Sequence, residues 1–263
     1  MYAFEYQRAK SVADAVAALA KTGGKALAGG QSLVGAMKLR LANPGTLVDI
    51  AGIAELKGIK QDGVAVVIGA MNTHADVASS AVVKKAIPAL AALAEGIGDR
   101  QVRNRGTIGG SLANNDPAAD YPAAVLALGA TVQTNKRKIA ADEFFKGMYE
   151  TALGADEIIT AVSFPVPKKA AYVKFPNPAS RFALVGVFVA QTQGGVRVAV
   201  TGAAAHVHRA TAIENALAKS FTADAAKAVK IPADRLNTDL HGSAEYRAHL
   251  VSVLASRAVA AAG

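Results

Sequence analysis

Gln101-Val102-Arg103-Asn104-Arg105-Gly106-Thr107-Ile108-Gly109-Gly110-Ser111-Leu112-Ala113-Asn114 is the stretch of this sequence that says most about its fold. Its paired glycines, serine and leucine have a counterpart upstream, Ala28-Gly29-Gly30-Gln31-Ser32-Leu33, which contains one additional residue. Glycines reach backbone angles that aim successive N–H groups into one anion-binding concavity, and they have no side chain to obstruct a diphosphate. Hydroxyl groups of Ser32, Thr107 and Ser111 are further donors, and a helix after Ser32 would direct its positive end to the same place. The pattern predicts two glycine segments that converge on one dinucleotide diphosphate.

Either glycine pair alone is more typical of an ordinary turn, since such pairs are common between secondary-structure elements. The recurrence of the pattern, each time after an extended run, favours the binding function. The sequence has no G-x-G-x-x-G at a strand-to-helix turn and no G-x-x-x-x-G-K-[ST]. A Rossmann site and a P-loop nucleotide site are therefore disfavoured.

Helix and strand signals alternate outward from these two segments. Ser11 is a helix cap, Gly23-Gly24 is a helix stop, and Asp116-Pro117 is expected to start a helix because proline suits the first turn. Apolar spacing predicts helices over Val12–Lys21, Leu33–Leu41, Thr73–Ala81 and Ile87–Ile97, and strands over Lys25–Ala28, Leu47–Ile50, Val64–Ile68, Ala130–Thr134 and Ile158–Pro165.

Four prolines between residues 165 and 178 mark a boundary. Beyond them Leu184–Gln191 and Val196–Thr201 are expected to pair as a hairpin around Gly194-Gly195, followed by alanine-rich helices. We therefore expect an α+β protein. One domain would cover residues 1–168, in subdomains of about 1–53 and 54–168, and a smaller α+β domain would cover residues 169–263.

The composition of the 263 residues limits the chemistry. The absence of cysteine excludes disulfides, thiolate nucleophiles, cysteine-ligated zinc and conventional iron–sulfur clusters, so redox chemistry requires an organic cofactor. The formal charge of +9 comes from dispersed basic residues, with no nucleic-acid motif or aromatic stacking platform among them. His206 and His208 would share one face of a strand, but no carboxylate pattern completes a metal site, and a packed or solvated pair is expected.

No apolar run approaches the length needed to cross a bilayer. The first six residues lack the basic segment and apolar stretch of a secretory signal. A cytoplasmic location is the expectation.

Three further segments strengthen the pattern of 28–33 and 101–114: Met37-Lys38-Leu39-Arg40, Gly69-Ala70-Met71-Asn72-Thr73-His74 and Asp116-Pro117-Ala118-Ala119-Asp120. On these segments the chain resembles, over nearly its whole length, the FAD-binding medium subunits of molybdenum hydroxylases, such as those of aerobic carbon monoxide dehydrogenase and xanthine dehydrogenase. Gln31 stands where many relatives have histidine, and Ser111 where many have asparagine, but both can hydrogen-bond. The resemblance implies a two-part FAD-binding domain of the vanillyl-alcohol-oxidase or PCMH type, followed by a smaller α+β domain.

The resemblance also implies which residues contact FAD. In that family both glycine segments contact the pyrophosphate, which points to Ala28, Gly29, Gly30, Gln31, Ser32, Leu33, Thr107, Gly109, Gly110 and Ser111. Asp120 matches a carboxylate that bonds ribityl or ribose hydroxyls, although a place in the first turn of a helix explains it equally. Ile97 and Ile159 match apolar contacts, with core packing as the stronger alternative. Lys174 and Phe182 match a lysine and an aromatic near the isoalloxazine ring; the alternatives are a solvated lysine and a core phenylalanine.

A division of labour follows from the resemblance. FAD would be bound by this chain, with the molybdenum cofactor on a large partner subunit and the iron–sulfur clusters on a small one, in an expected dimer of heterotrimers. Electrons would reach the flavin through the clusters and leave to an external acceptor, with no catalytic residue or metal ligand from this chain. Two alternatives stay open: a self-contained FAD-dependent oxidase or dehydrogenase, and a basic nucleic-acid-binding module with salt-dependent affinity.

Overall fold

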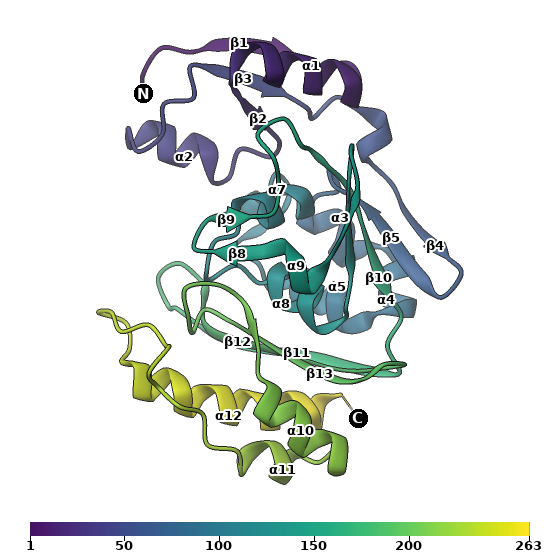
Figure 1. Ribbon diagram of the computed structural model, residues 1–263, viewed down its shortest axis with the longest axis vertical. Coiled ribbons are helices and arrows are strands. Elements are labelled where there is room, and N and C mark those ends of the chain that lie inside the picture. Colours follow the sequence, from purple (N-terminus) through teal and green to yellow (C-terminus); the bar gives the residue numbers. More distant parts are fainter. Residues whose placement is uncertain (263) are drawn as a thin grey trace.

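The N-terminal part of the chain forms a small parallel sheet in the computed structural model, which describes residues 1–262 (Figure 1). The strand order is β1 (Glu5–Arg8), β3 (Thr46–Asp49), β2 (Lys25–Leu27). Helix α1 (Val12–Thr22) packs Ala15 and Leu19 against Val48 on one face of this sheet. Ser11 caps α1 and Gly23 ends it in the left-handed conformation, as predicted. A short helix α2 (Leu33–Lys38) follows β2.

The middle part contains a five-stranded antiparallel sheet and most of the helices. Its strand order is β4 (Ile59–Asp62), β5 (Ala65–Gly69), β10 (Ile159–Pro165), β6 (Thr131–Thr134), β7 (Lys138–Ala140). The helices are the 3-10 turn η1 (Ala54–Leu56), α3 (His74–Ser79), α4 (Ala81–Ala86), α5 (Pro88–Glu95), α6 (Arg100–Arg103), α7 (Ile108–Asn114), α8 (Tyr121–Ala127) and α9 (Ala141–Phe144). Strands β8 (Phe145–Gly147) and β9 (Glu150–Thr151) pair as a separate hairpin.

The C-terminal part is a four-stranded antiparallel sheet backed by three helices. Its strands are, in order, β11 (Lys169–Pro176), β12 (Ala183–Thr192), β13 (Gly195–Thr201) and β14 (His208–Arg209), and its helices are α10 (Thr211–Lys219), α11 (Ala223–Lys227) and α12 (Ala244–Ala261). The sheet lies between α5 and α8 on one side and α10 and α12 on the other (Figure 1).

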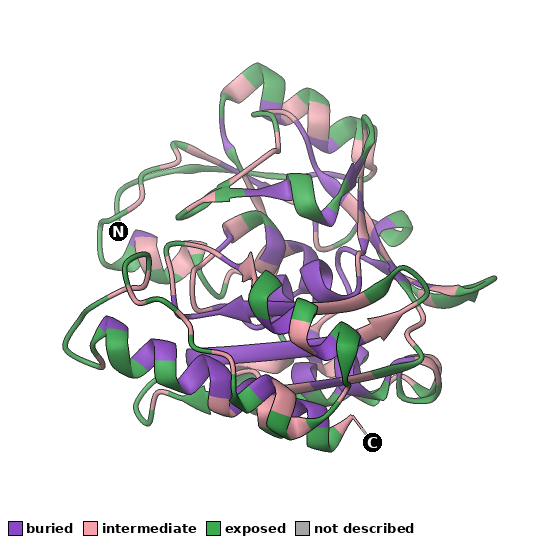
Figure 2. Ribbon diagram, turned by 60° about the horizontal axis from the view of Figure 1, so that its bottom comes forward, coloured by how far each residue is buried: buried purple, intermediate pink, exposed green. Residues whose placement is uncertain are grey.

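The central strand β12 contributes to two hydrophobic cores. Phe188 and Ala190 belong to the core of the middle part, whereas Val187 and Val189 pack in the core beneath α12. Buried residues accordingly run through the strands between the helix layers, and the outer faces of the helices are exposed (Figure 2). The α+β class is confirmed. The domain boundaries near 53 and 168 stay predictions.

Three local expectations differ from the structure. Asp116-Pro117 forms a turn in which the Asp116 carboxylate accepts from the Ala118 N–H at 2.9 Å, and α8 begins five residues after Asp116. The segment Ile108–Asn114, over which no helix was predicted, is helix α7 with Thr107 as its cap. Strand β11 lies among the prolines that mark the expected boundary.

None of the helices in the described part of the chain combines the length and the apolar composition that a bilayer crossing requires.

Candidate functional site

The two glycine segments are in direct contact. A Cβ added to Gly29 would lie 1.9 Å from the carbonyl oxygen of Arg105 and 3.0 Å from the Cα of Gly106, so only glycine permits this approach. A Cβ added to Gly110 would lie 3.7 Å from the Cβ of Ala28. The structure therefore brings together the two segments whose sequences resemble each other.

The first segment offers free backbone donors. Within residues 1–262, none of the five N–H groups of residues 28–32 donates a hydrogen bond. Gly30 has a φ of +75°, a left-handed conformation that glycine adopts without strain. Ser32 precedes α2 without making a side-chain cap bond, so its hydroxyl group is also free, while Leu33 begins the helix. Successive N–H groups around a left-handed residue form a concavity suited to an anion.

The second segment differs from the prediction. The Gly109 N–H donates to the Ala70 carbonyl at 2.9 Å, and the Gly110 N–H donates to Thr107 Oγ1 at 3.1 Å. The hypothesis that both glycine pairs free their amides for a ligand is thus wrong for Gly109-Gly110, because the Ala70 carbonyl and the capping hydroxyl of Thr107 already accept their N–H groups. Gly109 provides space, because a Cβ there would lie 2.6 Å from the Cβ of Ala70. A Cβ on Gly110 would crowd Thr107 Oγ1 at 2.9 Å but would meet the Cβ of Ala28 at an ordinary contact distance of 3.7 Å. Ser111 follows in the same turn of α7.

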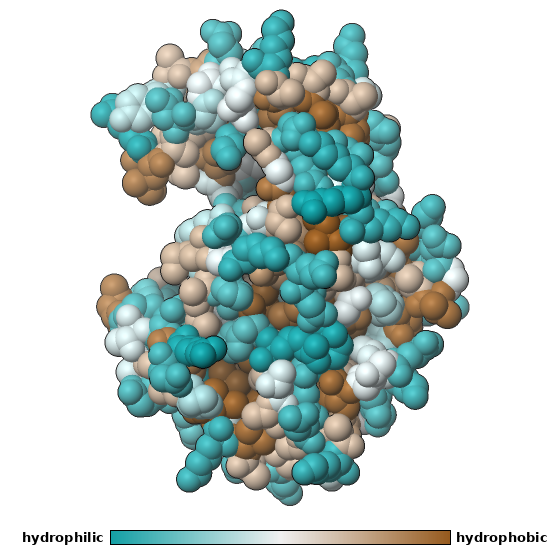
Figure 3. Space-filling model, in the orientation of Figure 1, coloured by the Kyte–Doolittle hydropathy of each residue, from teal (hydrophilic) through white to brown (hydrophobic). Residues whose placement is uncertain are grey.

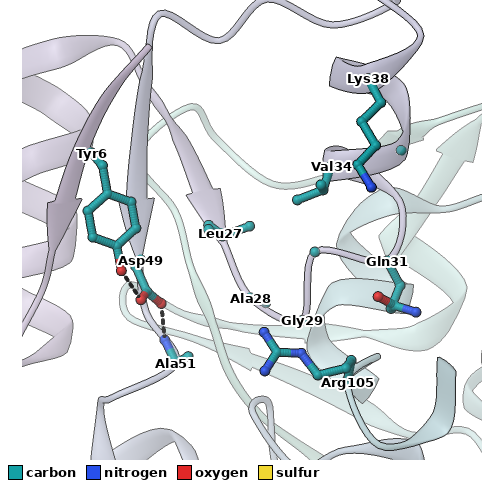
Figure 4. Close-up of a pocket in the computed structure, with 12 residues that line it drawn as sticks. Tyr6, Leu27, Ala28, Gly29, Gln31, Val34, Lys38, Asp49, Ala51 and Arg105 are labelled. Atoms are coloured by element: carbon teal, nitrogen blue, oxygen red, sulfur yellow. Dashed lines mark hydrogen bonds between the residues drawn. The ribbon is translucent and has the colours of Figure 1, made fainter. Parts of the chain in front are cut away.

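A cavity of about 500 Å³ opens beside the first segment. Figure 3 shows the molecule hollowed between the N-terminal part and the rest, and Figure 4 shows the lining residues. Lys38, from the end of α2, and Arg105 both point into the cavity (Figure 4). Neither cation forms a salt bridge within the described chain. The cavity is therefore positively charged next to unpaired backbone N–H groups.

Sequence reasoning missed several residues of this cavity. Lys38 and Val34 had a usable signal, because they follow Ser32 at the spacing of helix α2. Arg105 lies within the quoted glycine-bearing segment, but nothing in the sequence singles out its side chain. Tyr6 and Asp49 reach the cavity only because β1 and β3 pair in parallel, which no local pattern predicts.

A second polar cluster is centred on Lys174 of β11, whose side chain is only 13% exposed. Its ammonium group lies 3.0 and 3.2 Å from the two carboxylate oxygens of Asp120. It also donates to the carbonyl oxygens of Gly96 at 2.9 Å and Arg181 at 3.0 Å. The Tyr172 hydroxyl donates to Asp120 at 2.6 Å. The interpretation of Lys174 as a solvated lysine is thus wrong: its ammonium group connects the segments that contain Gly96, Asp120 and Arg181.

The Asp120 carboxyl has a raised pKa within this cluster. Burial raises the pKa of Asp120, while the Lys174 charge and the Tyr172 hydrogen bond oppose that shift. Arg103 donates to the carbonyls of Ile97 and Gly98, both at 3.0 Å. Lys174 and Arg103 therefore donate to all three carbonyl groups of the 96–98 turn.

The remaining expected site residues divide between surface and core. Phe182 is 47% exposed, so its interpretation as a core residue is wrong. Asp120 directly precedes α8 and is buried, rather than lying in the first turn of a helix opened by Asp116. Ile97 is half-buried beside the main core, and Ile159 is 4% exposed within it. Core packing accounts for Ile159, and its contact with a cofactor stays a prediction.

The buried side chain of His74 packs against Gly106 in the second glycine segment. A Cβ on Gly106 would lie 2.5 Å from His74 Nε2, and the His74 ring packs 5.3 Å from the Tyr121 ring. Burial, aided by the Arg103 charge, lowers the pKa of His74 to about 4. Neutral His74 therefore fills the space beneath Gly106.

The other histidines lie away from this region. His206 and His208 line a cavity of about 170 Å³ near Asp142 and Arg209. Burial lowers the pKa of His208. No group of three or more side chains suited to a metal ion is found among residues 1–262.

Two family matches together cover nearly the whole chain. Residues 2–167 match the family described as "FAD binding domain in molybdopterin dehydrogenase", and residues 170–262 match the "CO dehydrogenase flavoprotein C-terminal domain".

Individual relatives agree with these matches. The carbon monoxide dehydrogenase medium chain of Hydrogenophaga pseudoflava is 39% identical over 98% of this chain and 96% of its own length. The nicotine 6-hydroxylase medium subunit of Paenarthrobacter nicotinovorans is 37% identical over 99% and 98%, respectively. A solved carbon monoxide dehydrogenase from Hydrogenophaga pseudoflava, lacking the Mo-pyranopterin moiety, superposes with a TM-score of 0.90 at 40% identity, covering 99% of this chain and 97% of that one.

Proposed function

Because the chain belongs to the family of FAD binding domains in molybdopterin dehydrogenase, followed by a CO dehydrogenase flavoprotein C-terminal domain, we propose that it is the FAD-binding electron-transfer subunit of a molybdenum hydroxylase. Bound FAD would accept electrons from a partner subunit and pass them to an external acceptor. One observation carries the proposal: residues 28–31, whose N–H groups are unpaired, line a cavity with two unpaired cations, against a second glycine segment.

The donors of this cavity fit a dinucleotide diphosphate. A diphosphate needs several hydrogen-bond donors and positive charge at close range, and the first glycine segment, Lys38 and Arg105 supply both. Gly29 allows the two segments to approach each other, and Thr107 holds the first turn of α7 in place. The role of this chain's own residues is to bind and orient the cofactor, with no proton transfer.

We assign the flavin end of the cofactor to the region of Lys174. The family resemblance and the cations around the 96–98 turn support this assignment, because reduction adds negative charge to the ring. Asp120 holds Lys174 in place, and the exposed Phe182 is available as a cover for the ring. Ile97 would contribute an apolar contact.

The relatives that share almost the full length of this chain are medium subunits of larger enzymes. Because this chain has no cysteine, iron–sulfur clusters of the conventional kind must lie on a partner. We therefore propose a large molybdopterin-binding subunit and a small iron–sulfur subunit as partners. A dimer of heterotrimers in the cytoplasm completes the proposal, and the native mass of the complex and cell fractionation test these two points.

The test uses the full chain, expressed with and without the two partner genes. We expect one FAD per chain, and flavin reduction by substrate only in the assembled complex. Gly110→Val places a side chain between the glycine segments and should abolish FAD retention with little change in circular dichroism. A chain that binds no FAD, or a Gly110→Val and a Gly30→Val variant that both retain it fully, would contradict the proposal.

A further inference from the structure

A carboxylate shares the cavity that we assign to the FAD diphosphate. Asp49 lies at the end of β3, where it accepts a hydrogen bond from the Tyr6 hydroxyl and another from the Ala51 N–H at 2.8 Å. Figure 4 shows Tyr6 and Asp49 on one side of the cavity, with Lys38 and Val34 on the opposite side. Because a carboxylate repels a diphosphate, Asp49 has no part in binding that group.

Asp49 lies at a position in the parallel sheet where ligands commonly bind. Asp49 pairs with Arg8 in β1 and with Leu27 in β2, so Tyr6, two residues before Arg8, lies on the same face as all three. Val48 points to the other face, where α1 packs. The face with Tyr6 and Asp49 is thus the one that lines the cavity. Ligands of parallel sheets bind at the carboxyl ends of the strands, where Asp49 lies.

We propose that Asp49 and Tyr6 form the site for the adenosine half of FAD. The Asp49 carboxylate accepts a hydrogen bond from the ribose 2′-hydroxyl, since each of its oxygens retains a lone pair beyond the bonds it already accepts. The Tyr6 ring, whose residue is 54% exposed, offers an aromatic face to the adenine. This inference rests on the proposed function and adds the residues that distinguish FAD from FMN, which ends at its phosphate.

Charge decides which half of FAD the cavity holds. A carboxylate beside the isoalloxazine ring would oppose reduction, because the ring gains negative charge. At the other cluster the Asp120 carboxylate is paired with Lys174, and Arg103 adds a positive charge, so the net charge there suits a ring that gains electrons. Within the cavity, the positive charges of Lys38 and Arg105 suit the diphosphate, whereas the carboxylate of Asp49 suits the uncharged ribose.

Calorimetric titration of the full chain, freed of flavin, tests this assignment. FAD, FMN, ADP and 2′-deoxy-ADP are each titrated into the wild-type chain and into Asp49→Asn. We expect Asp49→Asn to weaken FAD and ADP binding by about 10- to 100-fold, as for loss of a hydrogen bond to a charged group. FMN affinity should stay within about twofold. The wild-type chain should prefer ADP to 2′-deoxy-ADP, and Asp49→Asn should lose that preference.

Two further variants make the result interpretable. Asp62→Asn makes the same chemical change at an exposed position in β4 outside the cavity lining, and should bind all four compounds as the wild type does. Tyr6→Ala leaves β3 unchanged and should weaken FAD but not FMN, which keeps the test valid if Asp49→Asn fails to fold.

Three outcomes would overturn the inference. They are unchanged FAD and ADP binding in a folded Asp49→Asn chain, equal weakening of FMN and FAD, and an unchanged preference for ADP over 2′-deoxy-ADP. A wild-type chain that binds no FAD at all would instead refute the proposed function.

Discussion

The side chain that Gly29 lacks would collide with backbone, which makes this glycine irreplaceable. A Cβ there would lie 1.9 Å from the Arg105 carbonyl oxygen, and backbone atoms cannot rotate away as a side chain can. We expect Gly29→Ala to push the two glycine segments apart, to lower the free energy of unfolding by about 1–3 kcal/mol and to abolish FAD retention. Urea unfolding of the FAD-free chain and the flavin content after purification measure the two effects.

The matched control for Gly29→Ala is Gly194→Ala in the β12–β13 turn. A Cβ on Gly194 meets only Thr192 Oγ1, at an ordinary contact distance of 3.8 Å. This variant should keep both its stability and its FAD. Equal behaviour of the two variants would show that the close approach of the glycine segments is not required.

His74 predicts how stability depends on pH. The pKa of His74 is lowered to about 4 in the folded chain, against an ordinary 6.5. Between these two pH values, His74 is protonated in the unfolded chain and neutral in the folded chain. The contribution of His74 to stability is therefore complete above pH 6.5 and is lost as the pH falls towards 4, by on the order of 3 kcal/mol. His74→Gln, which cannot titrate, should lack this part of the decline. Urea unfolding at pH 7, 6 and 5 compares the two slopes, and parallel curves would contradict the prediction.

At the scale of elements, helix α7 joins stability to cofactor binding. Thr107 caps α7 by accepting the Gly110 N–H, and Ser243 caps α12 in the same way by accepting the Tyr246 N–H at 3.2 Å. Thr107→Ala and Ser243→Ala should each cost about 1 kcal/mol of stability. Only Thr107→Ala should also weaken FAD binding, because α7 packs at the glycine segments and α12 does not. Thr107→Ser should restore both properties; loss of FAD in Ser243→Ala would show a general effect of instability.

The elements also show where sequence reasoning works and where it fails. Caps with a side-chain bond to the third residue, such as Ser11 and Thr73, were predictable because the whole signal is local. The helix predicted at Asp116 failed because the same side-chain bond can close a turn instead. Strand β11 was missed because the prolines in and around it were interpreted as a boundary. It is an edge strand, which tolerates a proline such as Pro176 where a central strand does not.

At the scale of the whole molecule, the candidate site depends on contacts between distant segments. The contact between the glycine segments could be predicted, since one motif occurs twice within the chain, whereas their common ligand stays a prediction. The Asp120–Lys174 pair joins residues 54 positions apart, and the family resemblance indicated the two residues but not their bond. Tyr6 and Asp49 come together only through the register of β1 and β3. Pairing of strands sets these positions, and a single sequence contains no local signal for it.

Because strand β12 belongs to two hydrophobic cores, we predict that the whole chain unfolds as one unit. Phe188 on one face of β12 stacks on Tyr172 and belongs to the core of the middle part, while Val187 on the other face belongs to the core beneath α12. Neither core can lose this strand and remain packed. Scanning calorimetry should therefore give a single transition with equal calorimetric and van't Hoff enthalpies. Phe188→Ala should lower the free energy of unfolding by about 3–5 kcal/mol and Val187→Ala by less, both shifting the same transition. Two transitions, each moved by only one of the variants, would instead show that the C-terminal part folds independently.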